Sequence, residues 1–154
     1  MKRKIIFLDI DGVLVNRTSL QKRSGQQAEA DKPCVEALNH IIQNTEAWIC
    51  VSSTWRIFGE TKIAMTLKDW GVRSNFAGVT PDHTRKVGYL YQGVERGDEI
   101  QAWLDDNKNF AGAFVILDDD TDMKHLSHRL IRTKFETGLT LQDAERAIVM
   151  LNEL

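Results

Sequence analysis

The sequence lacks most of the features that assign a chain to a disulfide-rich, secreted or membrane class. It has only two cysteines, Cys34 and Cys50, and they do not form a CxxC pair, so we expect reduced thiols. No apolar run is long enough to span a bilayer. The basic start at residues 1–4 is followed by too few apolar residues for a signal peptide. We therefore expect a soluble, cytoplasmic protein with no membrane partner.

An excess of charge of one sign is also missing. The net charge of -2 predicts no bulk attraction to nucleic acid, although it leaves room for a local basic patch. The 154 residues are 42% hydrophobic and 27% charged, which is typical of a globular chain. We find no repeat or low-complexity tract, and we expect one domain over residues 1–154. The sequence predicts no oligomeric state.

Short apolar runs alternate with stretches of helical spacing. The apolar runs predict five strands, over residues 5–8, 47–51, 76–80, 113–117 and 130–133. Helical spacing predicts helices near residues 33–44, 63–70, 98–106, 123–128 and 140–151. The polar stretches 16–30 and 82–97 are typical of loops, and the first predicts a flap over about 16–32. This alternation predicts an α/β fold with a parallel sheet of about five strands and helices on both faces.

Polar side chains stand where three of the predicted strands end. They are Asp9 and Asp11 after the first strand, Ser52 and Ser53 after the second, and Asp118 and Asp119 after the fourth. The carboxyl ends of parallel strands meet at one edge of a sheet, where ligands bind. Two unit charges about 4 Å apart repel by roughly 4 kcal/mol at an effective dielectric of 20, so the carboxylates need a proton or a cation. Mg²⁺ suits them because it takes oxygen ligands and keeps positions open for a phosphate. The alternative is that each acidic pair caps a helix or occupies a turn.

These residues resemble the motifs of the haloacid dehalogenase (HAD)-like phosphohydrolases. Residues 9–13 (Asp-Ile-Asp-Gly-Val) resemble the DxDG(T/V) signature, Ser52 the Ser/Thr at a strand end, and Asp118-Asp119 the acidic metal-binding motif. The wider pattern resembles the compact branch of that family found in Swiss-army-knife RNA repair proteins: Ser-Ser-x-Trp-Arg, Arg-Gly-x-Glu-Ile-x-x-Trp-Leu, Leu-Asp-Asp-Asp and Gly-Leu-Thr. The resemblance implies a Rossmann-like three-layer sandwich with a minimal, C0-type cap.

The resemblance also implies a mechanism and a set of roles. Asp9 is the nucleophile that forms an aspartyl-phosphate, and Asp11 is the general acid and then the general base. The expected Mg²⁺ ligands are Asp9, Asp118, Asp119 and Asp11, the last through its backbone carbonyl. Ser52 and the backbone N–H of Ser53 are expected to bind the phosphoryl oxygens.

Three assignments at the edge of the site have alternatives. Arg96 is the expected phosphate-neutralising base, and Lys86 is its rival because lysine is the commoner residue type in the family. Ser52 and Ser53 could instead cap a helix. Trp55 and Arg56 could stack on a base and hold a phosphate, or they could be a core residue and a surface charge.

The short gaps around the site predict an open site for large substrates, such as phosphorylated RNA or DNA ends. A small metabolite or nucleotide is the alternative substrate. A non-catalytic domain and a phospho-switch, in which phosphorylated Asp9 signals, are alternatives from other functional classes.

Overall fold

The fold is built on one parallel five-stranded sheet. The computed structural model describes residues 1–22, 28–83, 85–87, 90–92 and 95–153. The strands of the sheet are β1 (Arg3–Leu8), β2 (Trp48–Val51), β3 (Phe76–Val79), β6 (Ala111–Asp118) and β7 (Leu130–Arg132). They lie in the order β3-β2-β1-β6-β7, and each neighbouring pair is parallel. All five predicted strands are therefore confirmed.

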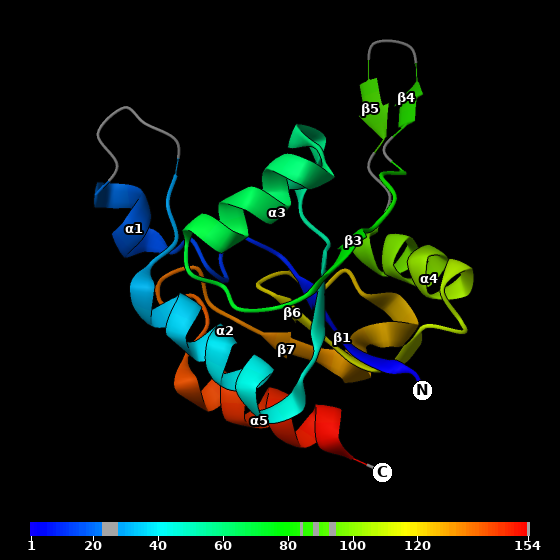
Figure 1. Cartoon of the computed structure of the whole chain (residues 1–154). Helices are drawn as coiled ribbons and strands as arrows, with labels where there is room; N and C mark the ends of the chain where they lie inside the picture. Colours follow the sequence, from blue (N-terminus) through cyan, green and yellow to red (C-terminus); the bar gives the residue numbers. More distant parts are fainter. Residues whose placement is uncertain (23–27, 84, 88–89, 93–94, 154) are drawn as a thin grey trace.

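Helices cover both faces of this sheet and make it the middle of three layers. The first face carries α2 (Lys32–Thr45), α3 (Glu60–Asp69) and α5 (Leu141–Asn152). Figure 1 shows α2 and α5 lying side by side below the sheet. The second face carries α4 (Arg96–Asp106) and the 3-10 helix η2 (Lys124–Arg129). The predicted α/β fold is confirmed.

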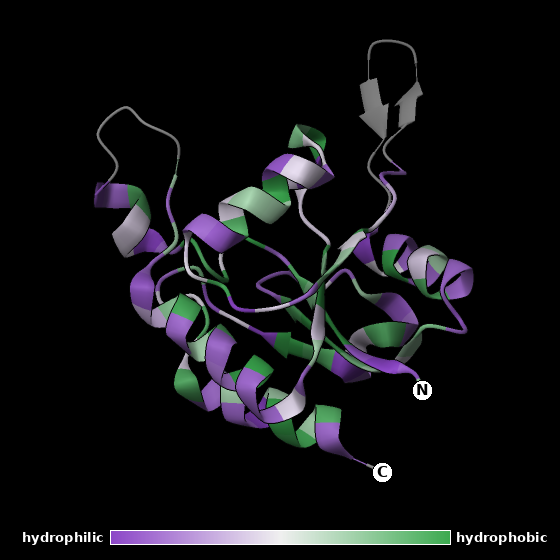
Figure 2. Cartoon of the chain, in the orientation of Figure 1, coloured by the Kyte–Doolittle hydropathy of each residue, from purple (hydrophilic) through white to green (hydrophobic). Residues whose placement is uncertain are grey.

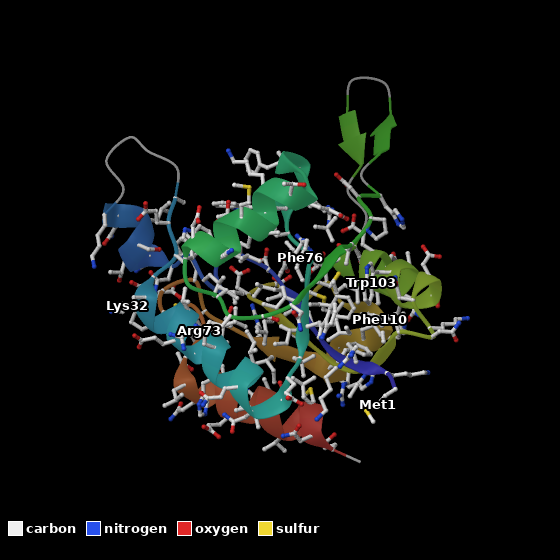
Figure 3. The ribbon with its side chains drawn as sticks, in the orientation of Figure 1. Met1, Lys32, Arg73, Phe76, Trp103 and Phe110 are labelled. Atoms are coloured by element: carbon white, nitrogen blue, oxygen red, sulfur yellow. The ribbon has the colours of Figure 1, made fainter. Side chains whose placement is uncertain are left out.

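Strand β1 is central and divides the core in two. Its side chains alternate, so Ile6 and Leu8 pack toward the first face while Ile5 and Phe7 pack toward the second. All four are fully buried, which explains why the run is apolar without a break. Figure 2 shows hydrophobic colouring on inner strands of the sheet, whereas the helices carry mixed hydrophobic and hydrophilic colouring. Figure 3 labels Trp103 and Phe110, which both belong to the core of the second face.

The predicted loop over residues 16–30 is wrong in part, because it contains the helix α1 (Arg17–Lys22). Reciprocal bonds start this helix. The Ser19 backbone N–H donates to Asn16 Oδ1 at 2.9 Å, and the Asn16 backbone N–H donates to Ser19 Oγ at 3.0 Å. The pair acts like a capping box, which polar composition alone does not reveal. The flap itself stays a prediction, and its residues 23–27 lie outside the described residues.

The predicted loop over residues 82–97 is also wrong in part. It contains two short antiparallel strands, β4 (Arg85–Val87) and β5 (Leu90–Gln92), and α4 begins at Arg96 rather than near residue 98. Val87 and Tyr91 are residue types that favour strands. This pair stands away from the main sheet in Figure 1.

The last helix, α5, begins as predicted, with a capping box between Thr140 and Asp143.

Both cysteines are buried and free. In the described part of the chain, no helix has the length and apolar character needed to cross a membrane.

Candidate active site

The parallel register brings three polar strand ends together. Leu8 of β1 is paired with Val51 of β2 on one side and with Leu117 of β6 on the other. The next residue on each strand is Asp9, Ser52 or Asp118, so these residues lie at the same edge of the sheet. The predicted meeting of residues more than a hundred positions apart follows directly from this register.

Three carboxylates gather at that edge. One oxygen each of Asp9, Asp118 and Asp119 lies within 4.8 Å of the others. Asp9 is 7% exposed and Asp118 is 1% exposed. Within the described residues this is the one group of His, Cys, Asp and Glu side chains arranged to hold a metal ion.

Backbone amides hold one oxygen of each buried carboxylate. The Ile10 N–H donates to Asp9 Oδ1 at 2.9 Å, and the Asp120 N–H donates to Asp118 Oδ1 at 3.0 Å. The other oxygen of Asp118, Oδ2, is buried and has no hydrogen-bond partner among the described residues. Such an atom is costly to leave unsatisfied, so its environment suits a ligand.

The electrostatics of the group favour a cation. Burial raises the pKa of Asp9, against the lowering effect of Arg96. Burial also raises the pKa of Asp118, and the charge of Asp9 raises it further. Without a cation, the Asp9–Asp118 pair therefore holds a proton more firmly than two separate carboxyl groups would. A set of crowded oxygen donors with one unsatisfied oxygen fits Mg²⁺, which prefers such ligands.

Close packing fixes the loop beside this group. Gly12 has φ +85°, and a Cβ added there would clash with the carboxyl group of Asp119. Only glycine fits at this point, because the backbone must come very close to Asp119. This contact is a structural reason for the glycine of the DxDG sequence.

The side chain of Asp11 does not join the carboxylate group. It is exposed, and its Oδ2 accepts a hydrogen bond from Trp55 Nε1 at 3.0 Å. The structure thus separates the two aspartates of the DxDG sequence. Asp9 lies with the carboxylates that could hold a metal ion, whereas the Asp11 carboxylate is bound by the indole of Trp55. Metal binding through the Asp11 backbone carbonyl stays a prediction.

The two serines differ. Ser52 is fully buried, and its Oγ has no hydrogen-bond partner among the described residues. Ser53 Oγ accepts from the Trp55 backbone N–H at 3.2 Å and caps the short 3-10 helix η1 (Thr54–Phe58). The capping alternative therefore describes Ser53, whereas the Ser52 hydroxyl is left available for a ligand.

Arg96 lies at the first residue of α4 and reaches into the site. Its Nη1 donates to the backbone carbonyl of Ser52, and its Nε lies 3.8 Å from Asp118 Oδ2. The structure therefore places Arg96 beside the carboxylates, as the sequence predicts. The rival Lys86 belongs to β4, and its side chain lies outside the described residues.

Trp55 and Arg56 are both committed to internal contacts. Trp55 is 9% exposed and packs edge-to-face on Trp70, with ring centroids 5.6 Å apart, so the predicted core role is confirmed. Arg56 is not a surface charge. Its side chain is buried and forms ion pairs with Glu99 of α4 at 2.8 Å and with Asp82 at 3.4 Å. Its role toward a phosphate stays a prediction.

Sequence reasoning missed Glu99, although it belongs to the quoted Arg-Gly-x-Glu pattern. Glu99 is 2% exposed, and its Oε2 also accepts from the His83 backbone N–H at 2.8 Å. The Arg56–Glu99 pair ties η1, which follows Ser52, to α4, which carries Arg96. A charged residue on the buried side of a helical pattern was the available signal.

Comparison with known proteins agrees with the motifs. Residues 5–144 match the family model described as the HAD domain in Swiss Army Knife RNA repair proteins. No curated protein matches the chain. The matched segment contains every residue of the site described above, and it covers most of the chain. The chain therefore belongs to the family of HAD domains found in Swiss Army Knife RNA repair proteins.

Proposed function

We propose that the chain is a Mg²⁺-dependent phosphomonoester hydrolase that works through an aspartyl-phosphate. The observation that carries this proposal is the group formed by Asp9, Asp118 and Asp119, with Arg96 beside it. The HAD family supports phosphohydrolase chemistry in general. Asp9 is the nucleophile because it is the first aspartate of the DxDG sequence and lies inside the carboxylate group.

The reaction has two displacements. A carboxylate oxygen of Asp9 attacks phosphorus, the ester P–O bond breaks, and Asp11 gives its proton to the leaving oxygen. Water then attacks the phosphorus of the aspartyl-phosphate and gives a proton to Asp11. The bond between Asp9 and phosphorus breaks, inorganic phosphate leaves, and both aspartates return to their starting states.

The division between the two aspartates matches these roles. Asp9 is buried beside the carboxylates of Asp118 and Asp119, whereas Asp11 is exposed and can face both a leaving group and water. Asp118, Asp119, Asp9 and the Asp11 carbonyl would hold the ion. When bound, Mg²⁺ supplies positive charge that offsets the charge of the carboxylates and of the phosphoryl oxygens.

Neutral and cationic donors complete the phosphate site. The unpartnered Ser52 hydroxyl can donate to one phosphoryl oxygen, and the Ser53 backbone N–H can donate to another. Arg96 already spans Ser52 and Asp118, so its guanidinium lies where phosphate charge would accumulate. These donors favour a dianionic phosphate ester as the substrate.

We assign phosphorylated RNA or DNA ends as the substrate class. The family description names RNA repair proteins. The stretch between β1 and α2 holds α1, and the stretch between β3 and α4 holds β4 and β5, so neither stretch is long enough for a cap domain. A site without such a cover accepts the end of a polymer.

Turnover of 4-nitrophenyl phosphate tests the chemistry. We expect Mg²⁺-dependent release of phosphate that EDTA abolishes and that Asp9→Asn reduces by at least about a thousandfold. Asp106→Asn is the matched control, because Asp106 is an exposed carboxylate at the far end of α4. Equal activity of Asp9→Asn and Asp106→Asn would refute the nucleophile assignment.

A further inference from the structure

A groove with a volume of about 420 Å³ opens beside the carboxylate group, on the side of β7. Its lining residues are Asp119, Arg132, Thr133, Lys134, Phe135 and Glu136. Asp119 belongs both to this groove and to the carboxylate group. A ligand in the groove would therefore adjoin a phosphate bound at the proposed active site.

Two positively charged side chains, Arg132 at the end of β7 and Lys134 just after it, lie on the same side of the chain. Side chains alternate along an extended strand, so Arg132 and Lys134 share one side and Thr133 takes the other. Arg132 and Lys134 are exposed, while Thr133 is 3% exposed and donates from Oγ1 to the Gly12 carbonyl at 2.6 Å. This bond fastens the floor of the groove to the loop that carries Asp9 and Asp11.

The acids of the groove are already engaged. Asp119 belongs to the proposed metal site. Glu136 forms an ion pair with Arg17 at 3.3 Å. Arg132 donates from Nε to the Asp119 carbonyl at 3.3 Å, which orients the guanidinium without neutralising it. Across the described residues, neither Arg132 nor Lys134 has a carboxylate within ion-pair distance, so their charges are available to an anion.

We propose that this groove binds a second phosphate group of the substrate. The inference rests on the proposed function, which places the reacting phosphate at Asp9. A phosphate held by Arg132 and Lys134 would belong to the neighbouring nucleotide of a strand or to the second phosphate of a nucleoside bisphosphate. The groove thus selects polyphosphorylated, nucleic-acid-like substrates over single-phosphate metabolites. It does so in a chain of net charge -2, because the two positive charges are local.

The test compares substrates with one phosphate and with two. The substrates are 4-nitrophenyl phosphate, a nucleoside monophosphate, a nucleoside 3′,5′-bisphosphate and dinucleotides with a terminal 3′- or 5′-phosphate. The variants are Arg132→Gln, Lys134→Gln and the double variant. Lys108→Gln is the control, because Lys108 is exposed and lies just before β6, at the opposite end of the sheet.

We expect the double variant to lower kcat/KM for the preferred two-phosphate substrate by about tenfold, with changes under about twofold for 4-nitrophenyl phosphate. Lys134→Gln alone should give part of this loss, and it leaves the Arg132 contact with Asp119 intact. Loss on dinucleotides alone identifies the internucleotide phosphate as the ligand. An equal loss on the bisphosphate identifies any second phosphate. Equal losses on all substrates, or no loss on any two-phosphate substrate, would overturn the proposal.

A binding measurement separates this inference from the proposed chemistry. A fluorescent dinucleotide with a terminal phosphate is titrated against Asp9→Asn protein with and without the two substitutions, at several salt concentrations. We expect weaker binding and a salt dependence that is shallower by about 0.7 per lost phosphate contact. This readout holds even if 4-nitrophenyl phosphate is not turned over. Unchanged affinity and unchanged salt dependence would refute the proposal that the groove binds a second phosphate.

Discussion

Replacing Trp55 with phenylalanine tests whether the indole positions the general acid. The change removes the Nε1–H that donates to Asp11 Oδ2 at 3.0 Å and keeps an aromatic ring against Trp70. As Asp11 gives up its proton, its carboxylate becomes charged, and a hydrogen bond to a charged group contributes about 1.5–3 kcal/mol. If all of it serves to orient Asp11 in the transition state, its loss slows proton transfer by roughly ten- to a hundredfold.

The leaving group distinguishes positioning from simple damage. An alkoxide leaving group needs the proton from Asp11, whereas 4-nitrophenolate leaves readily without one. We therefore expect Trp55→Phe to lower kcat for an alkyl phosphate by roughly ten- to a hundredfold and for 4-nitrophenyl phosphate by under about threefold. Trp70→Phe is the matched control, since it also removes an indole beside Trp55 but spares the bond to Asp11.

A double variant completes the assay. If Trp55 acts through Asp11, adding Trp55→Phe to Asp11→Asn changes kcat very little, because the group that it orients is already gone. Full additivity of the two substitutions would refute the reasoning. So would an equal loss on both leaving groups, since that pattern indicates a general disturbance of the site.

Two further predictions concern stability. In EDTA, the melting temperature should fall as pH rises from about 4, the ordinary pKa of a carboxyl group, to about 9, and Mg²⁺ should restore more of it at the upper end. Burial raises the pKa of Asp9 to about 6 and that of Asp118 to about 9, so the native state binds more protons than the unfolded state until pH passes these values. A melting temperature in EDTA that does not change with pH would contradict this prediction. Glu99→Gln should destabilise the fold by about 1.5–3 kcal/mol, measured by urea unfolding, because it removes the charged partner at 2.8 Å and leaves Arg56 with Asp82, at 3.4 Å, as its carboxylate. Replacing both partners with apolar residues should recover most of that loss, and a double variant as unstable as Glu99→Gln would contradict it.

The sequence predicted the sheet and its edge because both depend on local signals. Apolar runs flanked by polar residues mark buried strands, and a parallel sheet then has one possible edge for the groups that follow them. The proximity of Asp9 to Asp118 is a consequence of strand order, with β1 beside β6. No detail of side-chain packing was needed for that prediction.

Contacts between distant segments could not be predicted in the same way. Arg56 and Glu99 are 43 positions apart. The sequence shows Glu99 on the buried side of its helical pattern, but it does not show which cation Glu99 meets. Their pairing depends on how η1 and α4 approach each other at the edge of the sheet. The orientation of Asp11 is similar, because the DxDG sequence gives its position and the structure of η1 decides which donor its carboxylate meets.

The unsatisfied atoms of the site argue that it is built for a ligand rather than for stability. Ser52 Oγ and Asp118 Oδ2 are buried without hydrogen-bond partners among the described residues. Each such atom costs about 1–3 kcal/mol, which is large against a typical total stability of about 5–15 kcal/mol. Alanine at Ser52 would remove one of these costs and leave the sheet intact. The two atoms need different partners, because the hydroxyl needs an acceptor, and the carboxylate oxygen, which lies 3.8 Å from Arg96 Nε, needs a donor or a metal ion within bonding distance. A phosphate ester bound with Mg²⁺ supplies both at once, which an anion or a cation alone would not.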